Sequence, residues 1–224
     1  MARLQIYDHL LRFQLFQGLS RAELLQMAGN TKFGFLKEDE GKVVAREGTP
    51  CGQLLFLVSG SLTVVTRSDD GGYEVSELLA APWVLQPEAL FGARPRYSST
   101  YLTASPCHFI TLSKDEVMRL FDDFLIIRLN LLNMLSTMVQ RRSRYAWRSA
   151  PRSLRDRFVR FVLDHAVYPA GRKELRILMS RLADELGDSR IDVSRMLHQL
   201  QSENLLQLHR GRIEVLSLEH LLQA

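Results

Sequence analysis

The spacing of apolar residues changes twice along this chain. Intervals of three and four predict a helix within residues 4–16 and a short helix around 21–28, with Ser20 as its N-cap. Between residues 31 and 112 the period becomes two, which is typical of strands. The predicted strands are Lys32–Leu36, Lys42–Arg46, Leu54–Val58, Leu62–Thr66, Glu74–Leu79 and His108–Leu112. Short strands with glycine-containing turns and no intervening helix predict an antiparallel β-sandwich or small barrel.

Helical spacing returns after residue 112. The sequence from Ser113 to Glu116 has the pattern of a capping box, and a heptad pattern begins at Phe124. We expect this long helix to pack against a second copy of the chain, although packing on its own N-terminal domain is an alternative. The predicted interface residues are Phe124, Ile127, Leu131, Met134, Leu135 and Met138.

Residues 141–160 are strongly basic and contain a predicted hinge. They hold eight arginines and one acid, Asp156. Pro151 follows two small residues, which favours a break in the chain before the amphipathic helix that contains Phe158 and Phe161. The arginines are interpreted either as a solvated face or as contacts to phosphates. A short strand is predicted at Leu175–Leu178.

The stretch LADELGDSRIDVSRMLHQLQSENLL, residues 182–206, predicts two short helices joined by a tight turn. Gly187 suits the left-handed end of the first helix, and Ser189 suits the N-cap of the second. Val193, Met196 and Leu197 recur at helical spacing, so that face is expected to be buried. The opposite face is rich in arginine and small polar residues, which suits a DNA major groove. A helical hairpin with a merely solvated charged face is the alternative.

Residues 207–216 predict a β-hairpin with Gly211 at its turn. Two helices followed by a basic hairpin form a winged helix-turn-helix. The predicted DNA-binding residues are Ser189, Arg190, Asp192, Ser194, Arg195, His198, Arg210 and Arg212.

With this motif, the chain resembles the Crp/Fnr-type bacterial transcription regulators. Residues 43–48 (VVAREG) and 54–65 (LLFLVSGSLTVV) resemble the β-roll of the cyclic-nucleotide-binding-type sensor domain in the same family. The resemblance implies an α+β protein with three parts. These are a jelly-roll-like sensor domain with flanking helices (1–122), a dimerisation helix (123–148) and a winged helix-turn-helix domain (149–224).

The resemblance also implies a function. We expect a homodimer that binds double-stranded DNA sequence-specifically, contacts RNA polymerase and responds to a small-molecule effector. Many relatives carry a glutamate at the position of Ile191, where it can accept a hydrogen bond from a cytosine amino group. The usual operator of the family is therefore not expected to be preferred here.

The segment that holds the cyclic phosphate in cAMP-binding relatives departs from their pattern. Aligned on Leu90-Phe91, the glycine and glutamate of that pattern are Gln86 and Pro87, and the arginine is Ser98. Without the arginine, the phosphate loses its charge-assisted partner, and proline lacks a backbone donor. We therefore expect an effector other than cAMP or cGMP. The candidate effector pocket is formed by Glu88, Arg96, Ser98 and Ser99.

The identity of that effector is left open. Relatives sense by means of haem, iron–sulfur clusters or small organic acids. His9 and His108 are candidate haem ligands, although a lone histidine is more often structural. Two cysteines are too few for a four-cysteine cluster.

Composition and charge add two expectations. The N-terminus lacks the apolar core of a signal peptide and no apolar run reaches membrane-spanning length, so a cytoplasmic protein without membrane contact is expected. Residues 1–140 carry 13 Lys and Arg against 15 Asp and Glu, whereas residues 141–224 carry 16 against 10. The positive charge thus lies with the predicted DNA-binding part.

The sequence contains no recognisable catalytic motif or metal-ligand spacing, so we expect no enzyme. A cupin-type metalloenzyme would need several histidines on neighbouring strands, and His108 is alone there. The remaining alternative is a ligand- or partner-binding β-roll, for example a haem-based sensor, whose winged helix mediates protein contacts.

Overall fold

The computed structural model describes residues 2–145 and 147–223, and its fold is α+β, as predicted. The described chain forms two compact units. The first contains residues 1–62, 80–98 and 102–147, and the second contains residues 63–79, 99–101 and 148–224. The second unit therefore includes residues 63–79 and 99–101 of the predicted sensor domain. The predicted boundaries of the dimerisation helix, at residues 122 and 148, stay a prediction. Ala146, inside the predicted dimerisation helix, lies outside the described residues.

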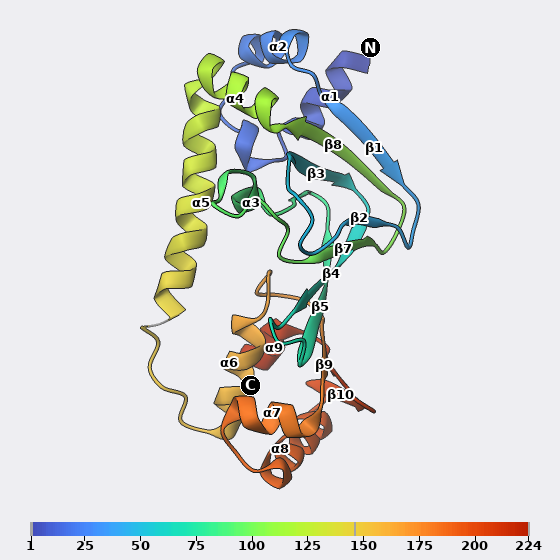
Figure 1. Cartoon of the computed structure of the whole chain (residues 1–224), viewed down its shortest axis with the longest axis vertical. Coiled ribbons are helices and arrows are strands. Elements are labelled where there is room, and N and C mark those ends of the chain that lie inside the picture. The colour runs from blue at the N-terminus through green and yellow to red at the C-terminus, as the bar shows by residue number, and fades with distance from the viewer. Residues whose placement is uncertain (1, 146, 224) are drawn as a thin grey trace. The chain divides into compact units, whose positions relative to one another are not determined.

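The first unit is an antiparallel sheet flanked by helices (Figure 1). Strands β1 (Gly34–Glu38), β8 (Cys107–Ser113), β3 (Gln53–Ser59) and β6 (Trp83–Val84) pair in that order. The short strand β2 (Val43–Ala45) also belongs to this unit, while β4 (Ser61–Arg67) and β7 (Thr100–Thr103) have residues in both units. The helices are α1 (Ala2–Leu10), η1 (Gln14–Phe16), α2 (Arg21–Asn30), α3 (Pro87–Phe91), α4 (Lys114–Asp123) and α5 (Leu125–Tyr145).

The predicted helix within residues 4–16 is interrupted in the structure. Its backbone is extended at Phe13, between α1 and η1. This break lets both Phe13 and Phe16 reach Phe56 of β3, with ring centroids 5.1 and 5.4 Å apart. All three rings are buried, so aromatic packing in the core overrides the local helical period.

The second unit combines the β4–β5 segment with the C-terminal part of the chain. Its strands pair in the order β10 (Leu206–His209), β11 (Arg212–Val215), β9 (Lys173–Ile177), β5 (Tyr73–Ala80) and β4. Its helices are α6 (Leu154–Asp164), α7 (Met179–Leu186), α8 (Arg190–Ser202) and α9 (Leu218–Gln223). The predicted hairpin at residues 207–216 is confirmed as β10–β11.

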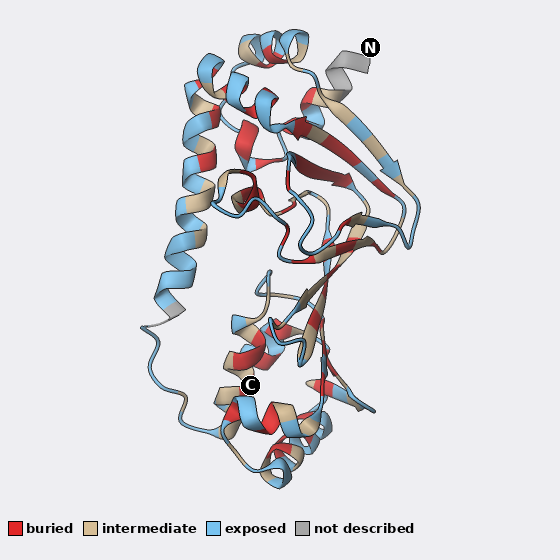
Figure 2. Cartoon of the chain, in the orientation of Figure 1, coloured by how far each residue is buried: buried red, intermediate tan, exposed pale blue. Residues whose placement is uncertain are grey.

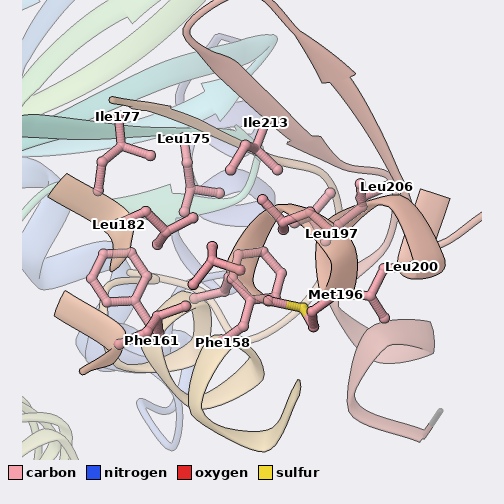
Figure 3. Close-up of a cluster of buried hydrophobic side chains, with 14 of the residues drawn as sticks. Phe158, Phe161, Leu175, Ile177, Leu182, Met196, Leu197, Leu200, Leu206 and Ile213 are labelled. Carbon is pink, nitrogen blue, oxygen red and sulfur yellow. The ribbon is translucent and has the colours of Figure 1, made fainter. Parts of the chain in front are cut away.

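One apolar cluster fixes the helices of this unit against its sheet (Figure 3). Phe158 of α6 and Leu197 of α8 are fully buried within it, and Val75 of β5 belongs to the same cluster. The face of α8 that was predicted to be buried is confirmed as buried, and α7 buries Leu182, Ala183 and Leu186. This packing leaves the opposite face of α8 in solvent.

The helix α5 is largely exposed along its length (Figure 2). Three residues predicted to contact a second copy, Phe124, Ile127 and Leu131, are instead only 5, 0 and 4% exposed within the single chain. They are buried because α5 packs on η1 and α4. The side-chain amide of Asn130 also donates to the carbonyl oxygens of Leu15 and Gln17, at 3.0 and 2.8 Å.

A neighbouring set of apolar residues on α5 remains exposed. Leu125, Leu129, Leu132 and Val139 are 63, 45, 54 and 66% exposed and follow heptad spacing. Met134, Leu135 and Met138 of the predicted interface are half-buried. The heptad pattern is therefore present, but its free face is shifted by one position from the predicted one.

None of the helices within residues 2–145 and 147–223 combines the length and hydrophobicity of a membrane span.

Candidate nucleic-acid interface

The turn between α7 and α8 has the geometry that the sequence predicts. Gly187 adopts the left-handed conformation, with φ of 62° and ψ of 44°. Its N–H donates to the carbonyl oxygen of Asp184, and the N–H of Asp188 donates to that of Ala183. Glycine fits here because a Cβ would strain this backbone conformation. The turn thus ends α7 and positions Ser189 to begin α8.

Ser189, Asp192 and Arg195 form a hydrogen-bonded chain at the start of α8. The Ser189 hydroxyl accepts from the Asp192 N–H at 3.1 Å and donates to Asp192 Oδ2 at 2.6 Å. Asp192 Oδ1 accepts from Arg195 Nη1 at 2.7 Å. The Ser189 N–H donates instead to Asp188 Oδ1, so the capping box is only half formed. Asp192 therefore holds the guanidinium of Arg195, whose side chain is 74% exposed.

The remaining predicted residues of α8 lie on its unburied side. Arg190 and His198 are exposed, and Ser194 is half-buried. Ile191, which stands where many relatives have glutamate, is 71% exposed. The structure thus leaves all six predicted residues of this helix and its cap exposed or half-buried, beside one exposed apolar side chain. Such a surface can donate hydrogen bonds to base edges and contact a thymine methyl group.

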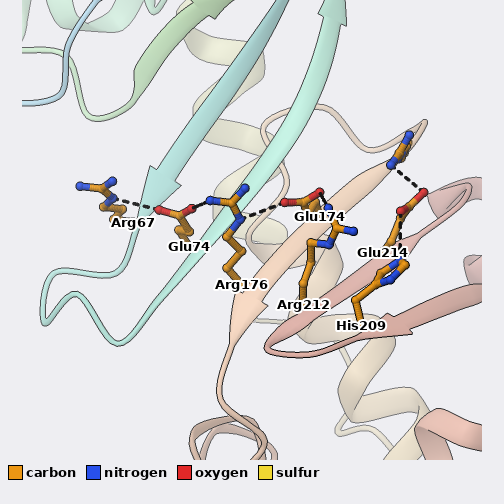
Figure 4. A network of polar contacts seen from close by, with 8 residues as sticks. Arg67, Glu74, Glu174, Arg176, His209, Arg212 and Glu214 are labelled. Atoms are coloured by element: carbon orange, nitrogen blue, oxygen red, sulfur yellow. Dashed lines mark hydrogen bonds and ion pairs between the residues drawn. The ribbon is translucent and has the colours of Figure 1, made fainter.

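The two arginines of the wing have different environments. Gly211 forms the tip with φ of 71°, and Arg210 beside it is exposed. Arg212 is half-buried, and its Nη1 lies 3.2 Å from Oε2 of Glu174 (Figure 4). Glu174 also accepts from Arg176 at 3.0 Å. Arg212 is therefore held within the unit, whereas Arg210 extends into solvent.

Two arginines of the basic segment at 141–160 support the helix-turn-helix. Arg157 pairs with Asp188 in the turn, and Arg155 Nη1 lies 2.8 Å from Glu203 at the end of α8. These ion pairs tie α6 to both ends of α8. Sequence reasoning missed this role because the partners are 31 and 48 residues apart.

The segment aligned with the cyclic-phosphate site is occupied by the side chain of Gln86. Gln86 precedes α3 with a φ of 36°. Its amide donates to the hydroxyl of Ser98 at 2.5 Å and accepts from the Ser98 N–H at 2.9 Å. A cyclic phosphate held here would need the Ser98 N–H as a donor, so Gln86 competes for it.

The predicted effector residues are only partly brought together. Glu88 lies beside Gln86, with 3.4 Å between the amide nitrogen and Oε1. Its other oxygen, Oε2, is buried without a hydrogen-bond partner among the described residues.

Arg96 donates to the carbonyl oxygen of Gly48 at 2.6 Å. Ser99 belongs to the second unit, where its hydroxyl bonds that of Thr66 at 2.7 Å. Of the four predicted residues, Glu88 and Ser98 are linked in the structure, through the side chain of Gln86.

His9 and His108, the candidate haem ligands, line one cavity of about 700 Å³ in the first unit. Most of its other lining residues are apolar, among them Ile6, Phe33 and Phe109. The Nδ1 atom of His108 lies 2.9 Å from the hydroxyl of Ser59, which leaves Nε2 for another partner. Within the described part of the chain, no cluster of three or more His, Cys, Asp or Glu side chains is arranged to hold a metal ion.

Comparison with protein-family models gives two matches. The model for the cyclic nucleotide-binding domain matches residues 37–124, and that for the Crp-like helix-turn-helix domain matches residues 156–224. Each match covers one of the two regions in which the sequence resemblance was found, and they occur in the same order.

Curated relatives match most of the chain. The "CRP-like protein Clp" of Xanthomonas euvesicatoria pv. vesicatoria (strain 85-10) is 27% identical over 183 residues, which cover 77% of this chain and 79% of that protein. Clp of Xanthomonas campestris pv. campestris (strain B100) matches to the same extent.

Solved structures share the fold. The catabolite activator protein of Thermus thermophilus has a TM-score of 0.54 at 21% identity, with 94% of this chain and 97% of that chain covered. The c-di-GMP responsive global regulator CLP of Xanthomonas campestris has a TM-score of 0.52 at 23% identity, with 87% and 98% covered. The sensor domain of the regulator DNR from Pseudomonas aeruginosa has a TM-score of 0.53 at 23% identity, with 63% and 93% covered.

Proposed function

Since the chain belongs to the Crp/Fnr-type transcription regulators, we propose that α8 is the helix that reads base pairs in the DNA major groove. The observation that carries this proposal is the division of α8 into two faces. Val193, Met196 and Leu197 fix the helix to its unit, while the Ser189–Asp192–Arg195 chain presents an exposed guanidinium. An arginine in this position can contact O6 and N7 of guanine bidentately.

We further propose that the regulator acts as a homodimer through the exposed leucine face of α5. This face consists of Leu125, Leu129, Leu132 and Val139, and its heptad spacing suits a parallel helix pair. A two-fold dimer places two recognition helices on the half-sites of a palindromic operator. Contact with RNA polymerase is part of the proposal, as is a cytoplasmic location without a catalytic role.

The wing supplies a first test, based on the different environments of its two arginines. Arg210→Ala is expected to weaken binding to all duplexes similarly and to lower the salt slope by about 0.9 per half-site, since one phosphate contact is lost. Arg212→Ala is expected to change the slope little because Arg212 is already paired with Glu174. Fluorescence anisotropy between 50 and 200 mM salt measures both slopes.

Equal slopes for the two variants and the wild type would contradict a phosphate contact by the wing. A wild-type protein whose binding to duplex DNA is weak and independent of salt would favour the alternative, in which the winged helix contacts a protein partner.

The effector is proposed to bind next to Glu88 and Ser98 in the first unit. Burial of Glu88 Oε2 without a hydrogen-bond partner among the described residues supports this, because a ligand amino or hydroxyl group would satisfy it. The regulator CLP of Xanthomonas campestris is c-di-GMP responsive, and a guanine base offers such N–H donors. We therefore propose c-di-GMP as the first candidate effector, ahead of cAMP, which lacks guanine, and of cGMP, whose cyclic phosphate finds no arginine partner at Ser98.

Calorimetry with these nucleotides tests the proposal. cAMP and cGMP are expected to give no heat of binding, because Gln86 accepts from the Ser98 N–H and no arginine stands at position 98 to pair with the phosphate. Glu88→Gln is expected to weaken any c-di-GMP binding about tenfold or more, since a charge-assisted hydrogen bond contributes about 1.5–3 kcal/mol. Micromolar affinity for cAMP would contradict this reading of the pocket.

Haem is the second candidate ligand, favoured by the apolar cavity that His9 and His108 both line. The absorbance spectrum of the purified protein shows directly whether haem is bound. A Soret band that is lost in His108→Ala would favour the haem-based sensor.

A further inference from the structure

The hairpin of β4 and β5 docks on the sheet of the DNA-binding domain. Strand β5 pairs antiparallel with β9, and Tyr73, Val75 and Glu77 face Ile177, Leu175 and Lys173 in register. On its other edge β9 pairs with β11 of the wing. The hairpin thereby extends the winged-helix sheet by strand addition, which supplies main-chain hydrogen bonds along the whole pairing.

A buried ion pair specifies this register. Nζ of Lys173 lies 2.8 Å from Oε2 of Glu77, and their side chains are 0 and 2% exposed. The carboxylate also accepts from the N–H groups of Val167 and Tyr168 at 2.6 and 3.0 Å. Lys173 donates in addition to the carbonyl oxygen of Ala170 at 2.7 Å. A pair with this many partners favours a single docked register, since a shift would leave both charges buried alone.

The outer contacts of the hairpin are also ionic or polar. Asp70 pairs with Arg181 of α7 at 2.8 Å, and Glu74 pairs with Arg176 at 3.2 Å (Figure 4). The Tyr73 hydroxyl lies 2.8 Å from Nε2 of His165. Hydrogen bonds from Ser68 and the Gly72 N–H, with the charge of Arg181, hold the pKa of Asp70 below its usual value. The hairpin therefore contacts the arginines of α7 and β9 through charged acids.

The charge of the hairpin opposes that of the domain on which it docks. Residues 63–79 carry four acids and one arginine, whereas residues 148–224 carry 13 Lys and Arg against 10 Asp and Glu. The whole second unit holds 14 Lys and Arg and 14 Asp and Glu, so docking of the hairpin brings the net charge of the unit to zero. Attraction to the DNA backbone depends on positive charge near the surface, and it weakens when this charge is neutralised within the protein.

From these contacts we propose that the β4–β5 hairpin is an acidic intramolecular ligand of the DNA-binding domain, which lowers its affinity for DNA while docked. Release of the hairpin removes one acidic partner from each of Arg176 and Arg181, which keep their ion pairs with Glu174 and Glu185, and it restores the positive charge of the domain. Residues 62 and 80, which flank the hairpin, belong to the first unit. An effector that shifts β4 or β5 would therefore change DNA affinity by moving the docking equilibrium. This inference rests on the proposed DNA-binding function.

A reversible disulfide between β5 and β9 tests the proposal on the full chain. Ser76 faces Glu174 in the pairing, both are half-buried, and facing residues have Cα atoms about 4.5–5.5 Å apart, within disulfide range. The double variant Ser76→Cys, Glu174→Cys is oxidised to lock the hairpin and reduced to free it. Cys51 and Cys107 are buried and remain in both forms.

The probe is a fluorescent 30-bp duplex of mixed sequence at low salt. The oxidised form is expected to bind about tenfold more weakly than the same protein after reduction, because the acidic hairpin can no longer leave. Equal affinities, or tighter binding by the oxidised form, would overturn the proposal.

A matched pair of surface variants separates docking contacts from net charge. Asp70→Asn removes the acidic partner that the hairpin gives Arg181, whereas Asp69→Asn removes the same charge from the neighbouring exposed residue. Asp70→Asn is expected to raise DNA affinity about threefold and to speed amide hydrogen exchange at residues 73–77, with a smaller effect for Asp69→Asn. Equal effects of the two variants would overturn a role for docking.

Failure of the DNA-binding function itself gives a different result. In that case no form binds the duplex at any salt concentration, while slow exchange at residues 73–77 still reports the docked hairpin.

Discussion

Lys173→Met is expected to lower the free energy of unfolding of the second unit by about 3–5 kcal/mol. The variant leaves the Glu77 carboxylate buried and without its cation, and such an uncompensated charge is costly. Of the described residues, Val167 and Tyr168 would still donate to it through their N–H groups. Chemical denaturation followed by circular dichroism measures the loss.

Two further variants show whether the buried charge is the cause. Adding Glu77→Gln to Lys173→Met removes the unpaired charge, so much of the lost stability should return. Arg172→Met breaks the ion pair with Glu214, but the Arg172 side chain is 60% exposed, and a loss below about 1 kcal/mol is expected. If the double variant is as unstable as Lys173→Met alone, lost packing rather than charge explains the effect.

Charged residues on the exposed face of α5 are expected to abolish the dimer. Leu132→Glu with Val139→Glu places two carboxylates in the proposed helix pair, where they would lose water without gaining a partner. Light scattering should show a monomer. Affinity for a palindromic duplex should fall by a factor of about 100 or more, since the second half-site is no longer engaged by a linked domain.

Leu25→Glu is the matched control for this change. Leu25 on α2 is 52% exposed, close to the 54% of Leu132, but lies outside the proposed interface. This variant should stay dimeric with unchanged DNA affinity. An intact dimer in the α5 double variant would place the interface elsewhere.

Local features of the DNA-binding region were predictable from the sequence. The left-handed Gly187, the Ser189 cap and the buried stripe of α8 depend on residues within one or two turns of each other. The wing is likewise a local hairpin around Gly211. Such signals survive in a single sequence because the interactions that produce them are close along the chain.

Features that depend on distant contacts were not predictable. The β4–β5 segment reads as another pair of strands in the β-roll, and nothing local indicates that Glu77 pairs with Lys173, 96 residues away. The heptad pattern of α5 gave the correct period but not the face, because η1 covers Ile127 and Leu131. Both faces of this helix are apolar, so only tertiary packing decides which one is free.

The central claim is that α8 reads DNA sequence through Arg195. Selection from random duplexes with the wild type and with Arg195→Ala tests it most directly, with Arg210→Ala as a control for backbone contacts. The wild type should enrich a palindrome, and Arg195→Ala should lose its preference for guanine at one base pair in each half-site, at a cost of about 1–3 kcal/mol. Arg210→Ala should keep the wild-type preference. If Arg195→Ala enriches the same palindrome with the same strength, α8 does not read the major groove as proposed.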